Sequence, residues 1–129
     1  MSKIEYKILL LLVMIFCHIV DDYYLQGWLA SAKQKSWWEK NCPDKLYKYD
    51  YLAALFMHSF SWTFMIMLIP TIYILLVGGT WSPLVFVANL AIHMIVDDSK
   101  ANRKKINLIQ DQSIHMIQIL ATWCGMILV

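Results

Sequence analysis

The chain has 129 residues, of which 60% are hydrophobic and only 16% are charged, and its formal net charge is +2. A soluble domain of this length carries about a quarter charged residues, so the composition favours a small multi-pass membrane protein. Such a small net charge also argues against nucleic acid as a partner. We therefore expect the lipid bilayer to be the main partner.

Four apolar segments reach, or nearly reach, the length needed to cross a membrane. A helix needs roughly 20 residues to span the hydrocarbon core. The segments cover residues 8–29, 51–77, 81–98 and 108–129, and a loop over residues 30–50 joins the first two. The first and third are long enough only if their aspartate-bearing ends stay helical and buried in protein. The pattern predicts a single all-α domain, an integral membrane four-helix bundle with up-down topology.

The N-terminal segment resembles a signal peptide in its first half. Lys3 and Lys7 precede an apolar run, but no small-residue cleavage site follows it, and the polar sequence from His18 to Asp22 comes almost directly after. We therefore interpret this segment as a retained span.

Basic residues predict the orientation of the bundle. Nine of the eleven Lys and Arg residues lie in the connections between the first and second and between the third and fourth segments. Basic residues accumulate in cytoplasmic loops, and aromatic rings that alternate with lysines, as in the loop at residues 30–50, favour the headgroup region. Both connections are therefore predicted to be cytoplasmic, with both termini on the non-cytoplasmic side, in a bacterial inner membrane.

The four histidines are predicted to lie at one depth of the bundle. His18 and His93 are near the ends of the first and third segments, whereas His58 and His115 are near the starts of the second and fourth. Because an up-down bundle reverses direction at each connection, all four fall in the cytoplasmic half of the membrane.

Three of these histidines have an aspartate four residues away, on the same face of a helix. The pairs are His18–Asp22, His93–Asp97 and Asp111–His115. A central Asp in a membrane helix costs about 2.5–3.5 kcal/mol on insertion scales. The polar faces are therefore expected to point toward one another in the interior of the bundle.

Imidazole and carboxylate groups together suit a divalent ion, with zinc as the first choice and manganese or iron as alternatives. The predicted metal ligands are His18, Asp22, His58, His93, Asp97, Asp111 and His115. This set is larger than one tetrahedral ion requires. It fits one or two ions, or one ion with a carboxylate left free as a general base.

These spaced motifs, in this order, resemble a small bacterial and phage membrane family known as domain of unknown function 3307. The motifs are His18-x-x-x-Asp22-x-x-x-Gln26 with Lys33 following, His58, His93-x-x-x-Asp97-x-x-Lys100, and Asp111-Gln112-x-x-His115. The likeness extends over nearly the whole chain but brings no activity with it. The chain also looks distantly similar to membrane-bound metal-dependent hydrolases, which place His and Asp near the ends of spans, an analogy of fold and ligand type.

The resulting hypothesis is a metal-dependent hydrolase that acts at the cytoplasmic headgroup level on a lipid or lipid-linked phosphoester. A bound metal would lower the pKa of its water toward about 7 and polarise the scissile group. His58 and Asp21 are the candidate acid or base groups, and Lys33 and Lys100 are candidates for holding the phosphate.

Two other classes of function fit the same residues. A structural His/Asp metal cluster could support cytoplasmic loops that bind a partner or modify a host envelope. His–Asp chains also conduct protons or ions, although four short spans without an inverted repeat argue against a transporter unless copies of the chain assemble. Homo-oligomerisation is therefore left open. Haem would use two histidines but would leave the paired aspartates unexplained.

Overall fold

The computed structural model describes residues 2–128, which form six α-helices and no strand. The helices are α1 (Lys3–Ile19), α2 (Leu29–Ala32), α3 (Lys35–Asn41), α4 (Asp50–Val77), α5 (Pro83–Ala101) and α6 (Leu108–Trp123). Two π-helical turns, η1 (Val20–Leu25) and η3 (Cys124–Leu128), continue α1 and α6, and a 3-10 turn, η2 (Lys45–Tyr47), precedes α4. The predicted all-α class is confirmed.

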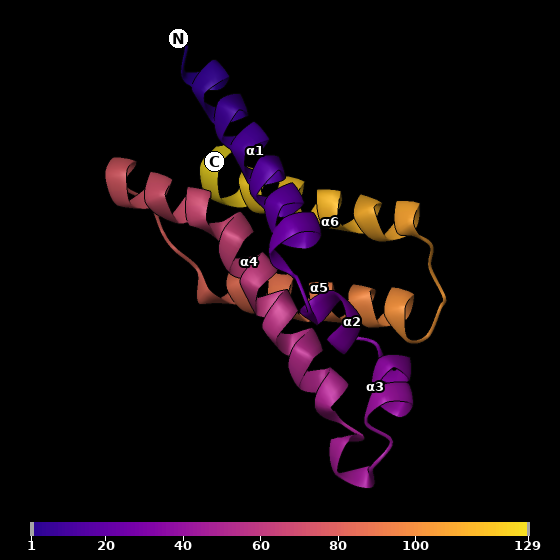
Figure 1. Cartoon of the computed structure of the whole chain (residues 1–129). Helices are drawn as coiled ribbons and strands as arrows, with labels where there is room; N and C mark the ends of the chain where they lie inside the picture. Colours follow the sequence, from indigo (N-terminus) through magenta and orange to yellow (C-terminus); the bar gives the residue numbers. More distant parts are fainter. Residues whose placement is uncertain (1, 129) are drawn as a thin grey trace.

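The four long helices α1, α4, α5 and α6 pack side by side. α4 lies between α1 and α5, and α6 packs against both α5 and α1 (Figure 1). α1 and α5 run toward the end where α2 and α3 lie, and α4 and α6 run back (Figure 1). At the opposite end, Lys7 Nζ of α1 donates to the carbonyl of Leu128 of η3 at 2.9 Å. Successive long helices therefore alternate in direction.

Capping residues fix the level at which α6 begins. The Asn107 side chain accepts a hydrogen bond from the backbone N–H of Gln110, and the Gln110 side chain accepts one from the backbone N–H of Asn107, which forms a capping box. Such a cap stabilises a helix by about 1 kcal/mol. It sets the positions of Asp111 and His115 in the first two turns of α6.

The π-helical turn η1 changes which residues of the first long segment face inward. Asp21 and Asp22 are adjacent, yet they are only 0% and 5% exposed. Neighbours in a regular α-helix point about 100° apart. A π turn inserts one extra residue and shifts this spacing, a device that is frequent at functional sites. Both carboxyl groups therefore enter the bundle.

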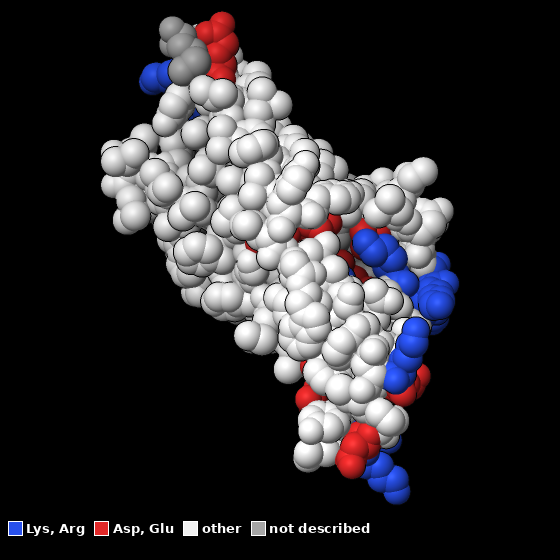
Figure 2. Space-filling model, in the orientation of Figure 1, with Lys and Arg blue, Asp and Glu red and all other residues white. Residues whose placement is uncertain are grey.

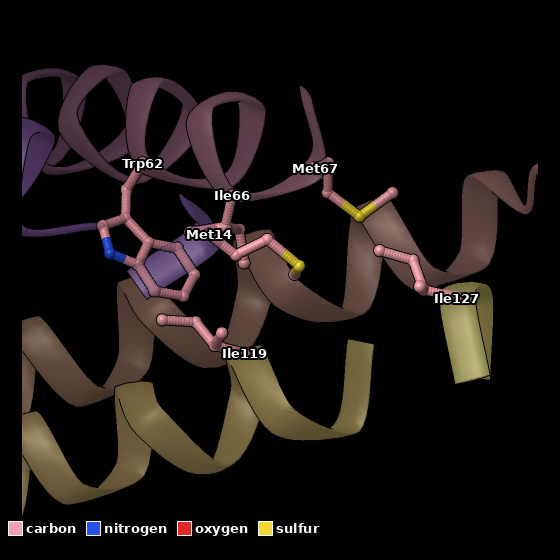
Figure 3. Packing of buried hydrophobic residues seen from close by; sticks show 6 residues of the cluster. All are labelled: Met14, Trp62, Ile66, Met67, Ile119 and Ile127. Carbon is pink, nitrogen blue, oxygen red and sulfur yellow. The ribbon is translucent and has the colours of Figure 1, made fainter. Parts of the chain in front are cut away.

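The apolar core lies on the side of Trp62 that is nearer to the chain ends. Its buried members are Met14, Trp62, Ile66, Met67, Ile119 and Ile127. Figure 3 shows the indole of Trp62 projecting from α4 toward Ile119 of α6, with Met14 and Ile66 beside it. This ring also contacts His18, His93 and His115, so it lies where the apolar core meets the histidines.

Two segments, Lys3–Leu25 and Lys45–Val77, are long and apolar enough to cross a membrane. They correspond to the first two of the four spans that the sequence predicts. Within residues 2–128 no other helix meets the same measure of length and hydropathy. The inner faces of α5 and α6 carry charged and polar groups, among them Asp97, Asp111 and Gln118.

The distribution of polarity is the reverse of that in a soluble protein. Among residues 2–128 the buried side chains are more often polar or charged than apolar. Large apolar side chains instead cover the outside, and Leu75, Leu84 and Ile109 are 79%, 77% and 77% exposed. Soluble proteins bury such residues and rarely expose wide apolar patches.

The backbone conformation directly after η1 favours glycine at position 27. Its φ is +49°, a left-handed conformation that costs other residues about 1–2 kcal/mol. We expect Gly27→Ala to lower the free energy of unfolding in detergent by that amount. Gly125→Ala is the control, because Gly125 lies in η3 and an added Cβ meets nothing within 4 Å. An equal effect of the two substitutions in denaturant titrations would contradict this account.

Candidate metal centre

All four histidine side chains lie together inside the bundle, and none is more than 1% exposed. The ring centroids of His93 and His115 are 4.2 Å apart, those of His58 and His93 are 5.2 Å apart, and those of His18 and His115 are 5.8 Å apart. The prediction that the histidines converge in the interior is confirmed.

His58 is surrounded by more acceptors than one proton can serve. Its Nε2 atom lies 3.3 Å from Asp22 Oδ1, 3.2 Å from Asp97 Oδ2 and 3.3 Å from His93 Nε2. One N–H bond points at one acceptor, whereas a cation contacts all of them at once. Ligands held 2.0–2.1 Å from a tetrahedral zinc ion lie about 3.3 Å apart. The spacing around His58 therefore suits a metal ion.

A second convergence of donors surrounds His115. Its Nε2 atom lies 3.5 Å from Asp97 Oδ1 and 3.5 Å from Asp111 Oδ1. All three atoms are buried, and none has a hydrogen-bond partner within the described part of the chain. An unpaired buried polar atom costs about 1–3 kcal/mol, and a cation between these three atoms could relieve that cost.

The donors form two overlapping groups. One contains Asp22, His58 and His93, and the other contains His93, Asp97 and His115. Within each group the candidate ligand atoms lie within 4.8 Å of one another. His93 belongs to both groups, and the carboxylate of Asp97 faces His58 with one oxygen and His115 with the other. The structure thus contains two buried His/Asp triads that could hold a metal ion.

Lys33 and Lys100 form ion pairs with the carboxylates of Asp97 on α5 and Asp111 on α6. Lys33 Nζ lies 2.6 Å from Asp97 Oδ2, and both side chains are buried. Lys100 Nζ lies 2.5 Å from Asp111 Oδ2, and its side chain is 28% exposed. Lys100 is therefore a cation at the edge of the cluster.

Lys33 reaches Asp97 because α2 is attached to the end of α5. Asn102 Nδ2 donates to the backbone carbonyl of Lys33 at 3.1 Å, and Asn102 Oδ1 accepts from the backbone N–H of Lys35 at 2.7 Å. These bonds hold the segment between α2 and α3 against α5. The Lys33 ammonium group therefore lies in the interior of the bundle and not at its surface.

A directional chain of hydrogen bonds orients Asp22. Trp62 Nε1 donates to His18 Nδ1 at 2.6 Å, so the proton of His18 must be on Nε2 when the ring is neutral. Nε2 then donates to Gln112 Oε1 at 2.9 Å. The Gln112 amide in turn donates to Asp22 Oδ2 at 2.8 Å and to Asp111 Oδ2 at 3.0 Å. The other oxygen of Asp22 is left facing His58.

His115 is oriented by a similar arrangement on its other side. The Gln118 amide nitrogen donates to the backbone carbonyl of Asn89 at 3.1 Å, so Gln118 Oε1 is free to accept from His115 Nδ1 at 3.2 Å. The lone pair of a neutral His115 ring is then on Nε2, toward the carboxylates. Metal-binding histidines commonly have their second nitrogen held in this way.

The lysines alone do not balance the charges of the cluster. Asp22, Asp97 and Asp111 supply three carboxylates, and Lys33 and Lys100 supply two ammonium groups. With neutral histidines, one negative charge is uncompensated in an interior where an ion loses several kcal/mol of hydration. A protonated histidine beside the carboxylates, or a bound cation, would compensate it.

The remaining predicted site residues lie around this cluster. His18 is bonded through both ring nitrogens, to Trp62 and Gln112, and is in neither triad. Asp21 accepts a hydrogen bond from Ser61 Oγ at 2.5 Å and is also outside the triads. Their predicted roles, as a ligand and as an acid or base, stay predictions.

Sequence reasoning gave no role to Trp62, although it contacts three of the four histidines. It donates to His18, stacks on His93 with ring centroids 4.1 Å apart, and lies 5.2 Å from His115. The chain has six Trp residues, and most Trp in membrane proteins marks the interface. The one usable signal was its position four residues after His58, on the same face of α4.

Comparison of the chain with protein-family models, with curated proteins and with solved structures finds no match. The resemblance to the domain of unknown function 3307 therefore stays a prediction. Function has to be argued from the geometry of the cluster.

Trp62→Phe is expected to weaken the cluster because it removes the donor that fixes the His18 ring. We expect the free energy of unfolding in detergent to fall by about 2 kcal/mol or more, since an unpaired buried nitrogen and a small cavity are created.

Trp81→Phe is the matched control. Trp81 Nε1 also donates one hydrogen bond, to Thr71 Oγ1 at 3.0 Å, but its side chain is 42% exposed. That substitution should cost less than about 1 kcal/mol. If the two variants unfold at the same denaturant concentration, the role assigned to Trp62 is wrong.

Proposed function

We propose that the chain is a multi-pass protein of the bacterial inner membrane in which α1, α4, α5 and α6 all cross the bilayer. The exposed apolar side chains and the buried polar ones support this proposal. Figure 2 adds that charged side chains gather at the two ends of the molecule, with a broad uncharged belt between them. The larger basic group lies at the end of α2 and α3, which is the end predicted to be cytoplasmic.

We further propose that the buried cluster binds one or two divalent ions, with zinc as the first candidate. The observation that carries this proposal is the Nε2 atom of His58, which faces two carboxylate oxygens and a second imidazole at 3.2–3.3 Å. A single ion would use Asp22, His58 and His93. A second would lie between His115 and the free oxygens of Asp97 and Asp111.

The activity that suits such a centre is metal-dependent hydrolysis of a lipid or lipid-linked phosphoester. The ion would activate water and polarise the phosphoryl group. Lys100, partly exposed and cationic, is placed to hold the phosphate beside the cluster. With a single ion at Asp22, His58 and His93, Asp111 Oδ1, which has no hydrogen-bond partner within residues 2–128, is the base that would accept a proton from the water. Water adds to phosphorus, and the alcohol leaves with the proton.

A structural metal cluster is the second candidate, and one observation favours it. The histidines and carboxylates supply more donors than a tetrahedral ion needs, and structural zinc sites are closed by protein ligands. A structural ion would stabilise the bundle without an open position for water. Activity measurements separate the two functions.

The metal content of the purified protein tests the proposed centre. We expect one or two zinc ions per chain by elemental analysis, and we expect His93→Gln to weaken binding by about 10–100-fold or more, because His93 belongs to both triads. Glu39→Gln is the control, since the Glu39 side chain is 65% exposed. Equal metal content in His93→Gln and wild type at limiting zinc would exclude the centre.

Release of inorganic phosphate from phosphatidic acid in reconstituted vesicles tests the hydrolase. We expect zinc-dependent release that Asp97→Asn abolishes and that Lys100→Gln impairs mainly through a higher KM, because Lys100 binds substrate rather than metal. If the zinc-loaded wild-type protein releases no phosphate from any phosphoester lipid, the hydrolase is excluded and the structural metal cluster remains as the function.

A further inference from the structure

A groove on the outer surface of the bundle runs beside α1 and α6. It is a shallow, open depression with a volume of about 530 Å³. Its walls are lined by Ile15, Ile19 and Met116, and its rim carries Tyr23 and Tyr24. These side chains suit an apolar chain, with a polar end at the level of the two tyrosines.

The floor of the groove is polar, which distinguishes it from an ordinary lipid-facing surface. His18 and Gln112 line it, and the Gln112 amide donates to Asp22 Oδ2 at 2.8 Å and to Asp111 Oδ2 at 3.0 Å. The groove is thus one side chain away from two carboxylates of the candidate centre. The residues that line the groove include no Asp, Glu, Lys or Arg, and Figure 2 shows acidic and basic side chains close together in a hollow beside the end of α1.

Lys100 provides a positive charge next to this floor. Its ammonium group shares Asp111 with Gln112, and its side chain is 28% exposed. Passing from the walls toward the centre, a ligand meets apolar side chains, then the amide of Gln112 and the imidazole of His18, and then the Asp111 carboxylate with Lys100 paired to it. The apolar walls suit an acyl chain, and Lys100, a cation beside the floor, suits a phosphate at the end of that chain.

We propose that the groove is a lateral binding site that admits one chain of an anionic phosphate lipid from the bilayer. The chain lies against Ile19 and Met116, and the phosphate reaches Lys100. This inference rests on the proposed function, because it describes how a phosphoester lipid reaches the metal centre. Binding itself does not require a metal, so the groove is testable separately.

The probe is oleoyl lysophosphatidic acid, titrated into the purified full-length protein in detergent and followed by native mass spectrometry. Oleoyl monoacylglycerol has the same chain without the phosphate, and inorganic phosphate has no chain. We expect lysophosphatidic acid to bind at least about tenfold more tightly than either. Comparable affinities for lysophosphatidic acid and the monoacylglycerol would overturn the phosphate part of the proposal.

Neighbouring residues of α6 provide a matched pair of variants. Met116→Trp fills the groove, whereas Ile117→Trp adds the same side chain at a position that is 63% exposed and outside the lining. We expect Met116→Trp to weaken binding of lysophosphatidic acid by about tenfold or more, and Ile117→Trp to change it less than about twofold. Equal affinities of the two variants would overturn the groove as the site.

Zinc content measured on the same samples separates this inference from the proposed function. If Met116→Trp keeps its zinc but loses lipid binding, the groove is the lipid site and the centre is intact. If the wild-type protein binds lysophosphatidic acid selectively but contains no zinc at saturating zinc, the groove stands and the metal centre fails. If it binds zinc but shows no preference for the phosphate lipid, the groove fails alone.

Discussion

The neutralisation of buried charge is the constraint on which the rest of this structure depends. Asp22 and Asp97 face His58 Nε2 at 3.3 and 3.2 Å inside the bundle, where removing an ion from water costs several kcal/mol. Lys33, Lys100 and the amide of Gln112 each hold one carboxylate oxygen, and the Asp97 oxygen held by Lys33 is the one that also faces His58. The other oxygen of each of these carboxylates remains for a cation. The protein groups thus orient the candidate ligand atoms and leave that position open.

The polar interior also explains the apolar exterior. A bundle of this size has too little volume to contain both a polar cluster and a full apolar core, so its buried apolar cluster is confined to the region beyond Trp62. In water such a molecule would lack the burial that stabilises soluble domains. In lipid the exposed apolar side chains cost nothing, and helix packing and polar contacts supply the stability.

Much of the site could be predicted because helical spacing is a property of the sequence. The four-residue intervals place His93 with Asp97 and Asp111 with His115, and both pairs face the interior as expected. His18 behaves differently. It bonds to Trp62 and Gln112, while Asp22, within the π turn, faces His58 instead. A π turn has no signature in composition or periodicity, so the spacing alone could not reveal this change of partner.

Tertiary packing, rather than spacing, determined the other differences. The burial of Lys33 follows from the attachment of α2 to Asn102, which lies 69 residues further along the chain, and no local pattern predicts so distant a contact. The loop at residues 30–50 also contains the short helices α2 and α3, each below two full turns, too brief for a periodic signal. Likewise, the residues that form the cluster lower the mean hydropathy of α5 and α6.

This uneven apolarity has a consequence for the assembly of the proposed membrane protein. The segments ending at Leu25 and Val77 are long and apolar enough to cross a membrane, and they carry Asp22 and His58. The partners of these groups on α5 and α6 are synthesised later. In the proposed bilayer, the first two segments would therefore expose polar groups until α5 and α6 pack against them, and those polar groups would draw in the second half of the chain as much as its own hydrophobicity.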